Sequence, residues 1–288
     1  MAELGRIEHG PAHVLLRTLP ARSVDMVYAD PPFFTQREWK AAGGGFSDVW
    51  RWDEAAERRL SALGSRCPAR ADLLQAIVVR APALAYLLAL EEIVDAAHRT
   101  LRPTGTFWLH IDDTAGAYAR VLVDHVFGSD RAWGSLTWRR STGSVPARRF
   151  ARCHDGIHAW VRTGAALSRL ASPAGEDCGR PMEIDGVRGW RLEAFAVDAL
   201  TSGSTERLGW PTQKPEALLR KVVALGSRRG DVVLDPCCGS GTTLAAARDL
   251  GRRWIGFDAS AAAVEIARGR LAATEGRQGE LFGEAADG

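Results

Sequence analysis

The chain of 288 residues has few cysteines, no long apolar run and no internal repeat. Its five cysteines are odd in number and irregularly spaced, so we expect no disulfide framework and a reducing compartment. No apolar stretch approaches the roughly 18 residues that a membrane span needs. The N-terminal stretch MAELGRIEHG also lacks the apolar segment of a secretion signal. These absences predict a soluble, cytoplasmic protein.

The composition excludes little else. The formal net charge is +2, so the overall charge does not demand an acidic partner. The hydrophobic fraction of 46% is ample for a packed core. Low complexity is confined to the C-terminal end, which is rich in Gly, Glu and Ala, and residues 274–288 are expected to form a flexible tail.

Strand and helix patterns alternate at both ends of the chain. In the N-terminal half, the patterns predict a buried strand over 24–29, a helix over 82–100 and a strand over 105–111. In the C-terminal half they predict helices over 216–227, 242–250 and 260–271, and strands over 231–235 and 253–258. Such alternation predicts an α/β fold with a mostly parallel sheet and helices on both faces.

Two stretches break this regularity. Residues 36–80 contain scattered tryptophans in a Gly-rich, charged sequence and are interpreted as loop with some helix. Residues 129–205 have turn residues and short β-like pieces, but no long periodic helix. We therefore expect residues 1–138 and 208–273 to form two halves of one domain, with 139–207 inserted between them.

A glycine loop follows the expected strand that ends at Asp235. Gly239-Ser240-Gly241 then leads into a helix, an arrangement in which free N–H groups can face a nucleotide. Asp258 ends the next strand, where an acid can accept hydrogen bonds from ribose hydroxyls. The motif is not a dinucleotide fingerprint, because Leu244 stands at the third glycine position, nor a P-loop, because no Lys precedes Thr242. An ordinary strand-to-helix turn is the alternative.

The Asp235 carboxylate stands at the end of the strand. Because it is negatively charged, it suits an ammonium group of a ligand better than a phosphate. S-adenosylmethionine carries both an amino acid head and a ribose, so it matches both Asp235 and Asp258. The loop is therefore interpreted as a site for S-adenosylmethionine.

A second motif, Asp30-Pro31-Pro32-Phe33, ends the strand near the N-terminus. The prolines stiffen the chain and leave carbonyl groups without local N–H partners. Asp30 and the Pro31 carbonyl can then accept the two hydrogens of an exocyclic amine, while Phe33 offers a flat face for stacking. Accepting these hydrogens stabilises the charge that develops as the amine attacks a methyl group. A proline-terminated strand end without function is the alternative.

Together these motifs resemble the amino-group DNA methyltransferases of the permuted β class, close to the bacterial adenine modification enzymes. The similarity covers about residues 7–34, 82–138 and 208–271. The residues that carry it are Asp30–Phe33, Trp108–Asp112, Trp210-Pro-Thr-Gln-Lys-Pro215, Asp235, Gly239, Gly241 and Asp258.

The resemblance implies a Rossmann-like, doubly wound fold in circularly permuted order with a small target-recognition region at 139–207. It implies base flipping and methyl transfer from S-adenosylmethionine to an amine in double-stranded DNA. A homodimer and a cognate restriction nuclease, as in restriction-modification systems, are further partners that we expect.

The resemblance also implies roles for particular residues. Asp30 and Pro31 would hold the amine. Phe33 would stack on the flipped base, and Pro32 joins it to the two residues that hold the amine. The cofactor residues would be Asp235, Pro236, Gly239, Ser240, Gly241, Thr242, Thr243, Asp258, Thr212, Gln213, Lys214 and Pro215. The family's Gly-Asp pair is replaced here by Gly10-Pro11, so we expect Glu8 or His9 to take its place at the cofactor's adenine ring.

A basic run is the candidate DNA-binding segment. Residues 131–154 contain six arginines and no acidic residue, with aromatic residues between them. Arginine neutralises phosphates and contacts guanine, and aromatic side chains stack on bases. The candidate contacts are Trp138, Arg139, Arg140, Arg148 and Arg149. A solvated arginine surface is the alternative.

Adenine N6 is the expected target, because the family associates Asp rather than Ser at position 30 with adenine. The N4 amine of cytosine is the alternative substrate, and a non-catalytic DNA-binding homologue or an RNA or protein methyltransferase are the other possibilities. His154 and His158 lack further ligands, so no metal is expected. Cys237 lies inside the cofactor loop and is not expected to attack a base.

Overall fold

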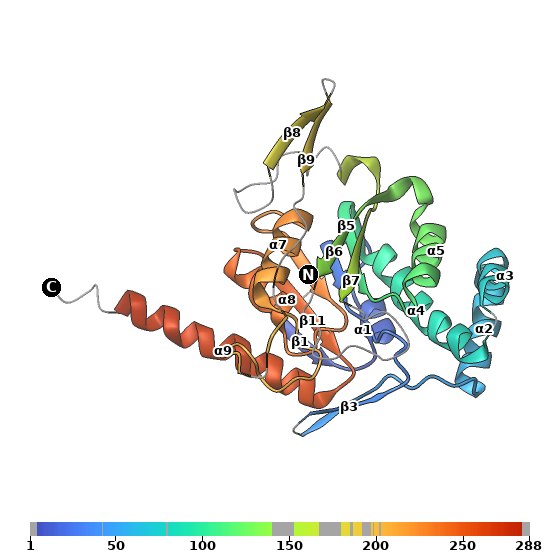
Figure 1. The fold of residues 1–288 in the computed structure, drawn as a ribbon, viewed down its shortest axis with the longest axis horizontal. Helices are drawn as coiled ribbons and strands as arrows, with labels where there is room; N and C mark the ends of the chain where they lie inside the picture. The colour runs from blue at the N-terminus through green and yellow to red at the C-terminus, as the bar shows by residue number, and fades with distance from the viewer. Residues whose placement is uncertain are drawn as a thin grey trace.

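The computed structural model describes residues 5–41, 43–78, 80–139, 153–166, 180–184, 187–191, 197, 199–201 and 203–283. Its centre is a seven-stranded sheet in the order β1-β11-β10-β2-β5-β7-β6, flanked by helices (Figure 1). The five strands from β1 to β5 in this order are parallel, whereas β7 and β6 are antiparallel. This architecture confirms the expected Rossmann-like fold.

The elements have the following bounds. The strands are β1 (Arg6–His9), β2 (Val24–Ala29), β3 (Glu38–Ala41), β4 (Gly44–Ser47), β5 (Leu101–Ile111), β6 (Ala132–Arg139), β7 (His154–Val161), β8 (Arg180–Ile184), β9 (Val187–Arg191), β10 (Val232–Asp235) and β11 (Arg253–Asp258). The helices are α1 (Ala12–Thr18), α2 (Glu54–Arg66), α3 (Pro68–Ile77), α4 (Ala81–Thr100), α5 (Gly116–Phe127), η1 (Ser129–Arg131), α7 (Glu216–Gly226), α8 (Thr242–Asp249) and α9 (Ala261–Gly283).

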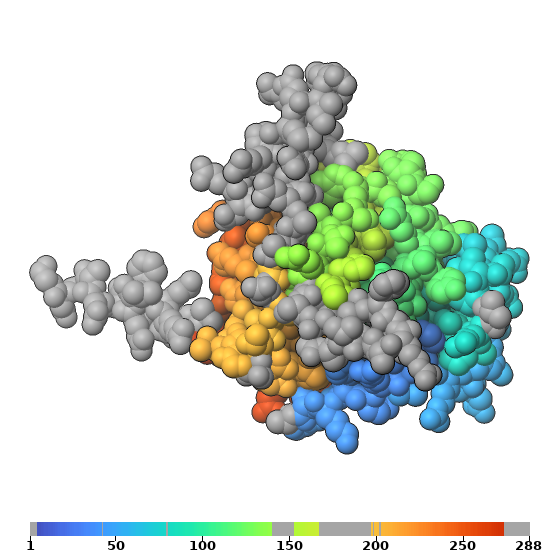
Figure 2. All heavy atoms as spheres, in the orientation of Figure 1, coloured from blue at the N-terminus to red at the C-terminus, as the bar shows by residue number. Residues whose placement is uncertain are grey.

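The two ends of the chain build one sheet. β10 pairs with β2 through Val233↔Met26 and Leu234↔Val27, and β11 pairs with β1. The buried carboxylate of Asp25 in β2 reinforces this junction, because it accepts a hydrogen bond from the Val232 N–H at 3.0 Å. In the space-filling view, the C-terminal block in orange lies against the N-terminal residues in blue (Figure 2). The order of the motifs along the chain is therefore compatible with a single site.

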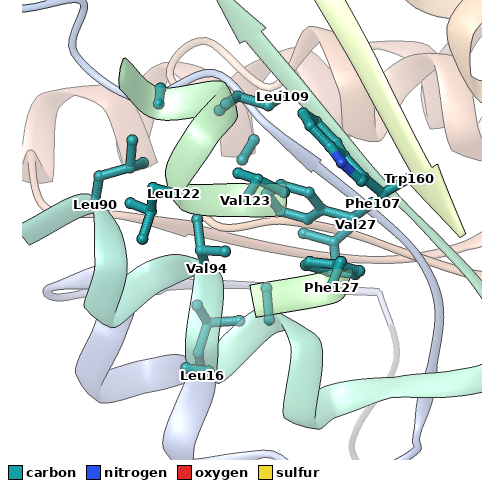
Figure 3. Close-up of a cluster of buried hydrophobic side chains, with 14 of the residues drawn as sticks. Leu16, Val27, Leu90, Val94, Phe107, Leu109, Leu122, Val123, Phe127 and Trp160 are labelled. Atoms are coloured by element: carbon teal, nitrogen blue, oxygen red, sulfur yellow. The ribbon is translucent and has the colours of Figure 1, made fainter. Parts of the chain in front are cut away.

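Alternating residues of the central strands face two apolar layers, because successive side chains of a strand point to opposite faces. On one face, Val27 and Phe107 pack against α1, α4 and α5 in the cluster of Figure 3. On the other face, Met26, Trp108 and Val233 pack against α7 and α8. Helices thus cover both faces of the sheet, as the sequence patterns predict.

The antiparallel edge corrects the expected domain boundary. Residues 139–207 were expected to form an insert, but β7 lies within this range and pairs with β5 from Thr106↔Val161 to Ile111↔Gly156. Its apolar residues are buried in the main sheet; Ile157 and Trp160 are almost fully covered. The strand β7 therefore belongs to the main sheet and not to a separate insert.

Two further stretches differ from the sequence interpretation. Within residues 36–80, the chain forms a β3–β4 hairpin and the helices α2 and α3, where loop with some helix was expected. Asp53 caps α2 by accepting a hydrogen bond from the Ala56 N–H, and Pro68 begins α3. At the C-terminal end, α9 continues to Gly283, so the expected flexible tail is helical up to that residue. Within the described residues, no helix is long and apolar enough to cross a membrane.

Gly226 provides a test of the packing between α7 and the sheet. A Cβ at this position would contact Trp108 Nε1 and lie 2.8 Å from Met26 Sδ, and both side chains are buried. We expect Gly226→Ala to lower the free energy of unfolding by about 1–3 kcal/mol through overpacking. Chemical denaturation followed by circular dichroism would measure this change.

Gly64 is the matched control, because it also lies in a helix but a Cβ there would meet open space. Gly64→Ala should raise the free energy of unfolding by roughly 0.5–1 kcal/mol through helix propensity alone. Equal effects of the two substitutions would contradict the tight packing at Gly226.

Candidate functional site

A cavity of about 480 Å³ opens where β2, β10 and β11 end. The carboxyl ends of parallel strands meet at one edge of the sheet, and ligands of open α/β sheets bind in the crevice outside them. The predicted residues that line the cavity are Asp30, Pro31, Pro32, Phe33, Thr212, Gln213, Lys214, Asp235, Pro236, Gly239, Ser240, Thr242, Thr243 and Asp258. The sheet therefore brings the two motifs together, although Asp30 and Asp235 lie 205 positions apart (235 − 30).

Two of the predicted residues shape the cavity without lining it. Gly241 has a φ of 76° and stands at the N-cap of α8, where a Cβ would lie 2.9 Å from Ala267 Cβ. Only glycine meets both the left-handed backbone and the close approach of α9 without strain. Pro215 stands at the N-cap of α7 and so fixes where the segment of Thr212–Lys214 ends.

Asp235 is a buried carboxyl group at the floor of the cavity. Its Oδ1 accepts a hydrogen bond from the Cys237 N–H at 3.0 Å. Burial raises the pKa of Asp235 to about 7; hydrogen bonds from Thr243 and Cys237 oppose the rise, and the charges of Asp30 and Asp258 add to it. The group therefore changes charge near neutral pH, and a cation placed beside it would favour the ionised form.

Asp258 joins the glycine loop to the start of α9. One oxygen accepts from the Gly239 N–H at 2.8 Å, and the other from the Ser260 N–H at 2.8 Å. Burial raises the pKa of Asp258, and these two hydrogen bonds limit the rise. The carboxylate thus holds the loop closed while lining the cavity.

Asp30 is paired with a lysine from the other end of the chain. The Lys214 ammonium lies 2.5 Å from Asp30 Oδ2 and 5.0 Å from the centroid of the Phe33 ring. Lys214 was expected among the cofactor residues, and the structure places its charged group against Asp30 and Phe33. Sequence spacing could not reveal this contact, because it depends on how α7 packs against the sheet.

A series of buried, hydrogen-bonded polar side chains lies behind Phe33. The Tyr28 hydroxyl is 2.6 Å from His110 Nδ1, and His110 Nε2 is 3.3 Å from Asp155 Oδ2. The Phe33 and His110 rings pack at 5.8 Å between centroids. Burial lowers the pKa of His110, so the ring is neutral at pH 7, with Nε2–H donating to Asp155 and Nδ1 accepting from Tyr28. This series fixes the ring against which Phe33 rests.

The β3–β4 hairpin adds an aromatic wall that the sequence interpretation missed. Phe46 stacks between Trp39 and Trp210, with centroids 6.2 and 5.8 Å apart, and all three rings line the cavity. Asp48 braces the hairpin from inside, because its buried carboxylate accepts from the Thr35 N–H at 2.7 Å and from Trp50 Nε1 at 2.8 Å. The aromatic residues between positions 39 and 50 were a signal for this wall.

The expected replacements for the missing Gly-Asp pair do not line the cavity. Glu8 pairs with Arg6 at 2.9 Å, and His9 Nε2 lies 3.1 Å from the Ala259 carbonyl oxygen. The residues that follow them line the wall instead, namely Pro11, Ala12 and His13.

The candidate DNA contacts have different fates. Arg139 is exposed at the end of β6, whereas Trp138 is 3% exposed and donates from Nε1 to the Val197 carbonyl at 2.7 Å. Trp138 is therefore a packing residue of the sheet, which corrects its expected role in contacting DNA. Arg140, Arg148 and Arg149 lie outside the described residues. Within the described part, no cluster of His, Cys, Asp and Glu could hold a metal ion.

Comparisons with known proteins identify the family of this chain. A family model described as DNA methylase, for N6 and N4 methyltransferases, matches residues 24–269. The chain is 26% identical over 278 residues to the type II methyltransferase M.HinfI of Haemophilus influenzae, covering 93% of this chain and 68% of that protein. It is also 26% identical over 275 residues to the type II methyltransferase M2.DpnII of Streptococcus pneumoniae, covering 92% and 88%.

The fold has counterparts among solved structures. TTHA0409 of Thermus thermophilus, a candidate DNA modification methylase, superimposes with a TM-score of 0.60 at 19% identity, covering 93% of this chain and 94% of that one. The same protein has been solved with S-adenosylmethionine. The match of the family model across both motifs and the sheet between them shows that the chain belongs to the DNA methylase family and is an S-adenosylmethionine-dependent DNA methyltransferase.

Proposed function

We propose that the protein transfers a methyl group from S-adenosylmethionine to the N6 amine of adenine in double-stranded DNA. One observation carries this proposal: Asp30, the acceptor for an amine, and Asp235 and Asp258, the acceptors for a cofactor, line the same cavity. A target base must leave the duplex to reach such a cavity, at a cost of about a few kcal/mol.

The residues present fit S-adenosylmethionine. Asp235 would hold the ammonium group of the methionine moiety and Asp258 the ribose hydroxyls. The loop Gly239–Thr243 would follow the methionine chain. A Cβ at Gly239 would lie 2.9 Å from Trp210 Nε1, so glycine allows the Trp210 ring to pack closely against this loop. The cofactor supplies an electrophilic methyl group when bound.

The chemistry of the amine pocket follows from the Asp30 motif. The amine of a base is a poor nucleophile, because its lone pair is conjugated with the ring. Asp30 and the Pro31 carbonyl would accept its two hydrogens and stabilise the positive charge that develops on nitrogen. Phe33 would stack on the base, and its support by His110 would hold the amine in line with the methyl group.

We propose adenine rather than cytosine as the target because position 30 is Asp. The N4 amine of cytosine is the second candidate target, because the same two acceptors serve either amine. The relatives M.HinfI and M2.DpnII are named as type II methyltransferases, which supports a role in restriction-modification. We further propose that the protein acts with a cognate nuclease, forms a homodimer and is located in the cytoplasm.

Sequence recognition is proposed to reside between β7 and residue 207, with the arginines at the end of β6 holding the DNA backbone. Arg139 is exposed there and Arg140 follows it in the sequence. Contacts between these arginines and the DNA phosphates would offset part of the free-energy cost of rotating the base out of the duplex.

Analysis of the modified nucleosides tests the substrate directly. Purified protein would be incubated with unmethylated duplex DNA and S-adenosylmethionine, and the digested DNA analysed by mass spectrometry. We expect N6-methyladenine as the product. N4-methylcytosine would instead identify cytosine as the target. The absence of any methylated base, in DNA that contains many different sequences, would contradict the proposal.

Asp30→Ala is the variant control for this assay. It should abolish methyl transfer while binding of S-adenosylmethionine, measured by calorimetry, survives. Loss of cofactor binding would mean that Asp30 belongs to the cofactor site instead.

The affinity for the cofactor should depend on pH. The pKa of Asp235 is raised to about 7, and a bound ammonium group favours the carboxylate, so protonation of Asp235 competes with binding. Calorimetry at falling pH should show the Kd rising below pH 7 and approaching about tenfold per pH unit. Asp235→Asn should bind more weakly and without this dependence, whereas a flat wild-type profile from about pH 7.5 to 5.5 would refute the assignment.

The arginine assignment predicts a change in salt dependence. Replacing Arg139 and Arg140 together by Ala should weaken DNA binding and lower the slope of log K against log salt by about 2, roughly one for each lost phosphate contact. Fluorescence anisotropy at several salt concentrations would measure this slope. An unchanged slope would exclude both arginines from the DNA interface.

A further inference from the structure

The cavity contains one of the few lysines of this chain. Lys40, Lys214 and Lys221 are the lysines of the entire sequence, in which Lys and Arg together number 37. Lys40 lies on the β3–β4 hairpin, and Lys221 lies in α7. Of the three, only Lys214 lines the cavity. Almost all positively charged side chains of this protein are arginines, yet the one that pairs with Asp30 is a lysine.

The Lys214 ammonium lies where the target amine is expected. It is 2.5 Å from Asp30 Oδ2, and it lies over the face of Phe33 at 5.0 Å from the ring centroid. In the proposed reaction, the amine of the flipped base donates to Asp30 while its ring stacks on Phe33. Both contacts of the substrate are therefore already made by a group of the protein.

We propose that Lys214 occupies the position of the target amine in the enzyme without DNA, and that the amine of the entering base displaces it from Asp30. This inference rests on the proposed methylation of a base amine. Lys214 is thus a positioning residue, which keeps Asp30 and Phe33 in the arrangement that the base later requires.

The charges around Asp30 explain why such an occupant is useful. Asp30 is 16% exposed and contributes, by its charge, to the raised pKa of the buried Asp235. Leaving a partly buried carboxylate without a partner costs free energy, because it loses water without gaining a hydrogen bond. The ammonium of Lys214 supplies such a partner for Asp30 before the base enters.

Lysine suits exchange better than arginine does. A guanidinium group binds a carboxylate through two parallel hydrogen bonds, whereas an ammonium is a point charge on a flexible stem. An arginine at position 214 would hold Asp30 more firmly against an incoming amine. The exchange also removes a positive charge from the place where the amine nitrogen becomes positive during methyl transfer.

The backbone around Lys214 is held in place, so only its side chain needs to move. The Gln213 side chain accepts from the Leu208 N–H at 2.8 Å and donates to the Glu206 carbonyl at 2.7 Å. The Glu206 carboxylate also accepts from the Glu216 N–H at 2.8 Å. These bonds fix the segment before α7 on both sides of Lys214.

Two substitutions at position 214 separate exchange from a simple need for positive charge. Lys214→Met removes the charge but keeps an unbranched side chain, and Lys214→Arg keeps the charge but binds Asp30 in a bidentate manner. Lys40→Met is the matched control, because Lys40 lies outside the cavity. For each protein we would measure kcat and KM for unmethylated DNA, the Kd for S-adenosylmethionine without DNA, and the Tm.

We expect Lys214→Arg to have a kcat/KM for DNA about tenfold lower than that of Lys214→Met, equivalent to about 1.4 kcal/mol. Lys40→Met should resemble the wild type. The opposite order, with Lys214→Arg active and Lys214→Met inactive, would overturn the proposal, because the charge itself would then be required. A loss of cofactor affinity in Lys214→Met that Lys214→Arg restores would also overturn it, since Lys214 would then bind the cofactor.

The wild-type protein offers a second measurement that does not depend on the stability of variants. With nitrogen-15 lysine, the three ammonium groups can be followed by NMR, and Lys40→Met assigns one of them. Addition of unmethylated DNA with S-adenosylhomocysteine should move one lysine signal from the position of an ion-paired ammonium to that of a hydrated one. No change in the presence of DNA that the wild type methylates would contradict the exchange, whereas failure of wild-type methylation would contradict the proposed function instead.

Discussion

The parallel pairing of β2 with β10 is the constraint on which the site depends. These buried strands come from opposite ends of the chain, and their register, Val233↔Met26 and Leu234↔Val27, sets where each strand ends. Because both strands run in the same direction, Asp30 and Asp235 emerge at the same edge of the sheet. Burial of apolar side chains from both strands stabilises this pairing, so the free energy that folds the core also assembles the cavity.

The cavity is built around acidic groups whose charges interact. Burial alone pushes Asp235 and Asp258 towards the neutral form, and the hydrogen bonds from Thr243, Cys237, Gly239 and Ser260 oppose this tendency. Asp30 is held by the ammonium of Lys214. Such an arrangement suits a ligand that brings positive charge, and the ion pair with Lys214 holds the Asp30 side chain in place.

Much of the fold could be predicted from local patterns. The apolar run of β2, the long periodic helix α4 and the strand-to-helix turn around Gly239 could be predicted. They depend on the spacing of apolar residues and on turn residues that lie close together in the sequence. The prediction failed where tertiary contacts decide the structure. The β3–β4 hairpin depends on the buried carboxylate of Asp48, and β7 joins the sheet because its apolar face packs against β5.

The sequence by itself determined the chemistry of the two motifs, because carboxylates, prolines and glycines have the same hydrogen-bonding capacity and backbone preferences wherever they stand. Only the tertiary structure decided which side chains meet. It buried Trp138 against Val197, brought Lys214 to Asp30 across 184 positions of chain, and built an aromatic wall from Trp39, Phe46 and Trp210. Such contacts depend on how helices and sheet edges pack, and packing is a property of the entire core and not of any short segment.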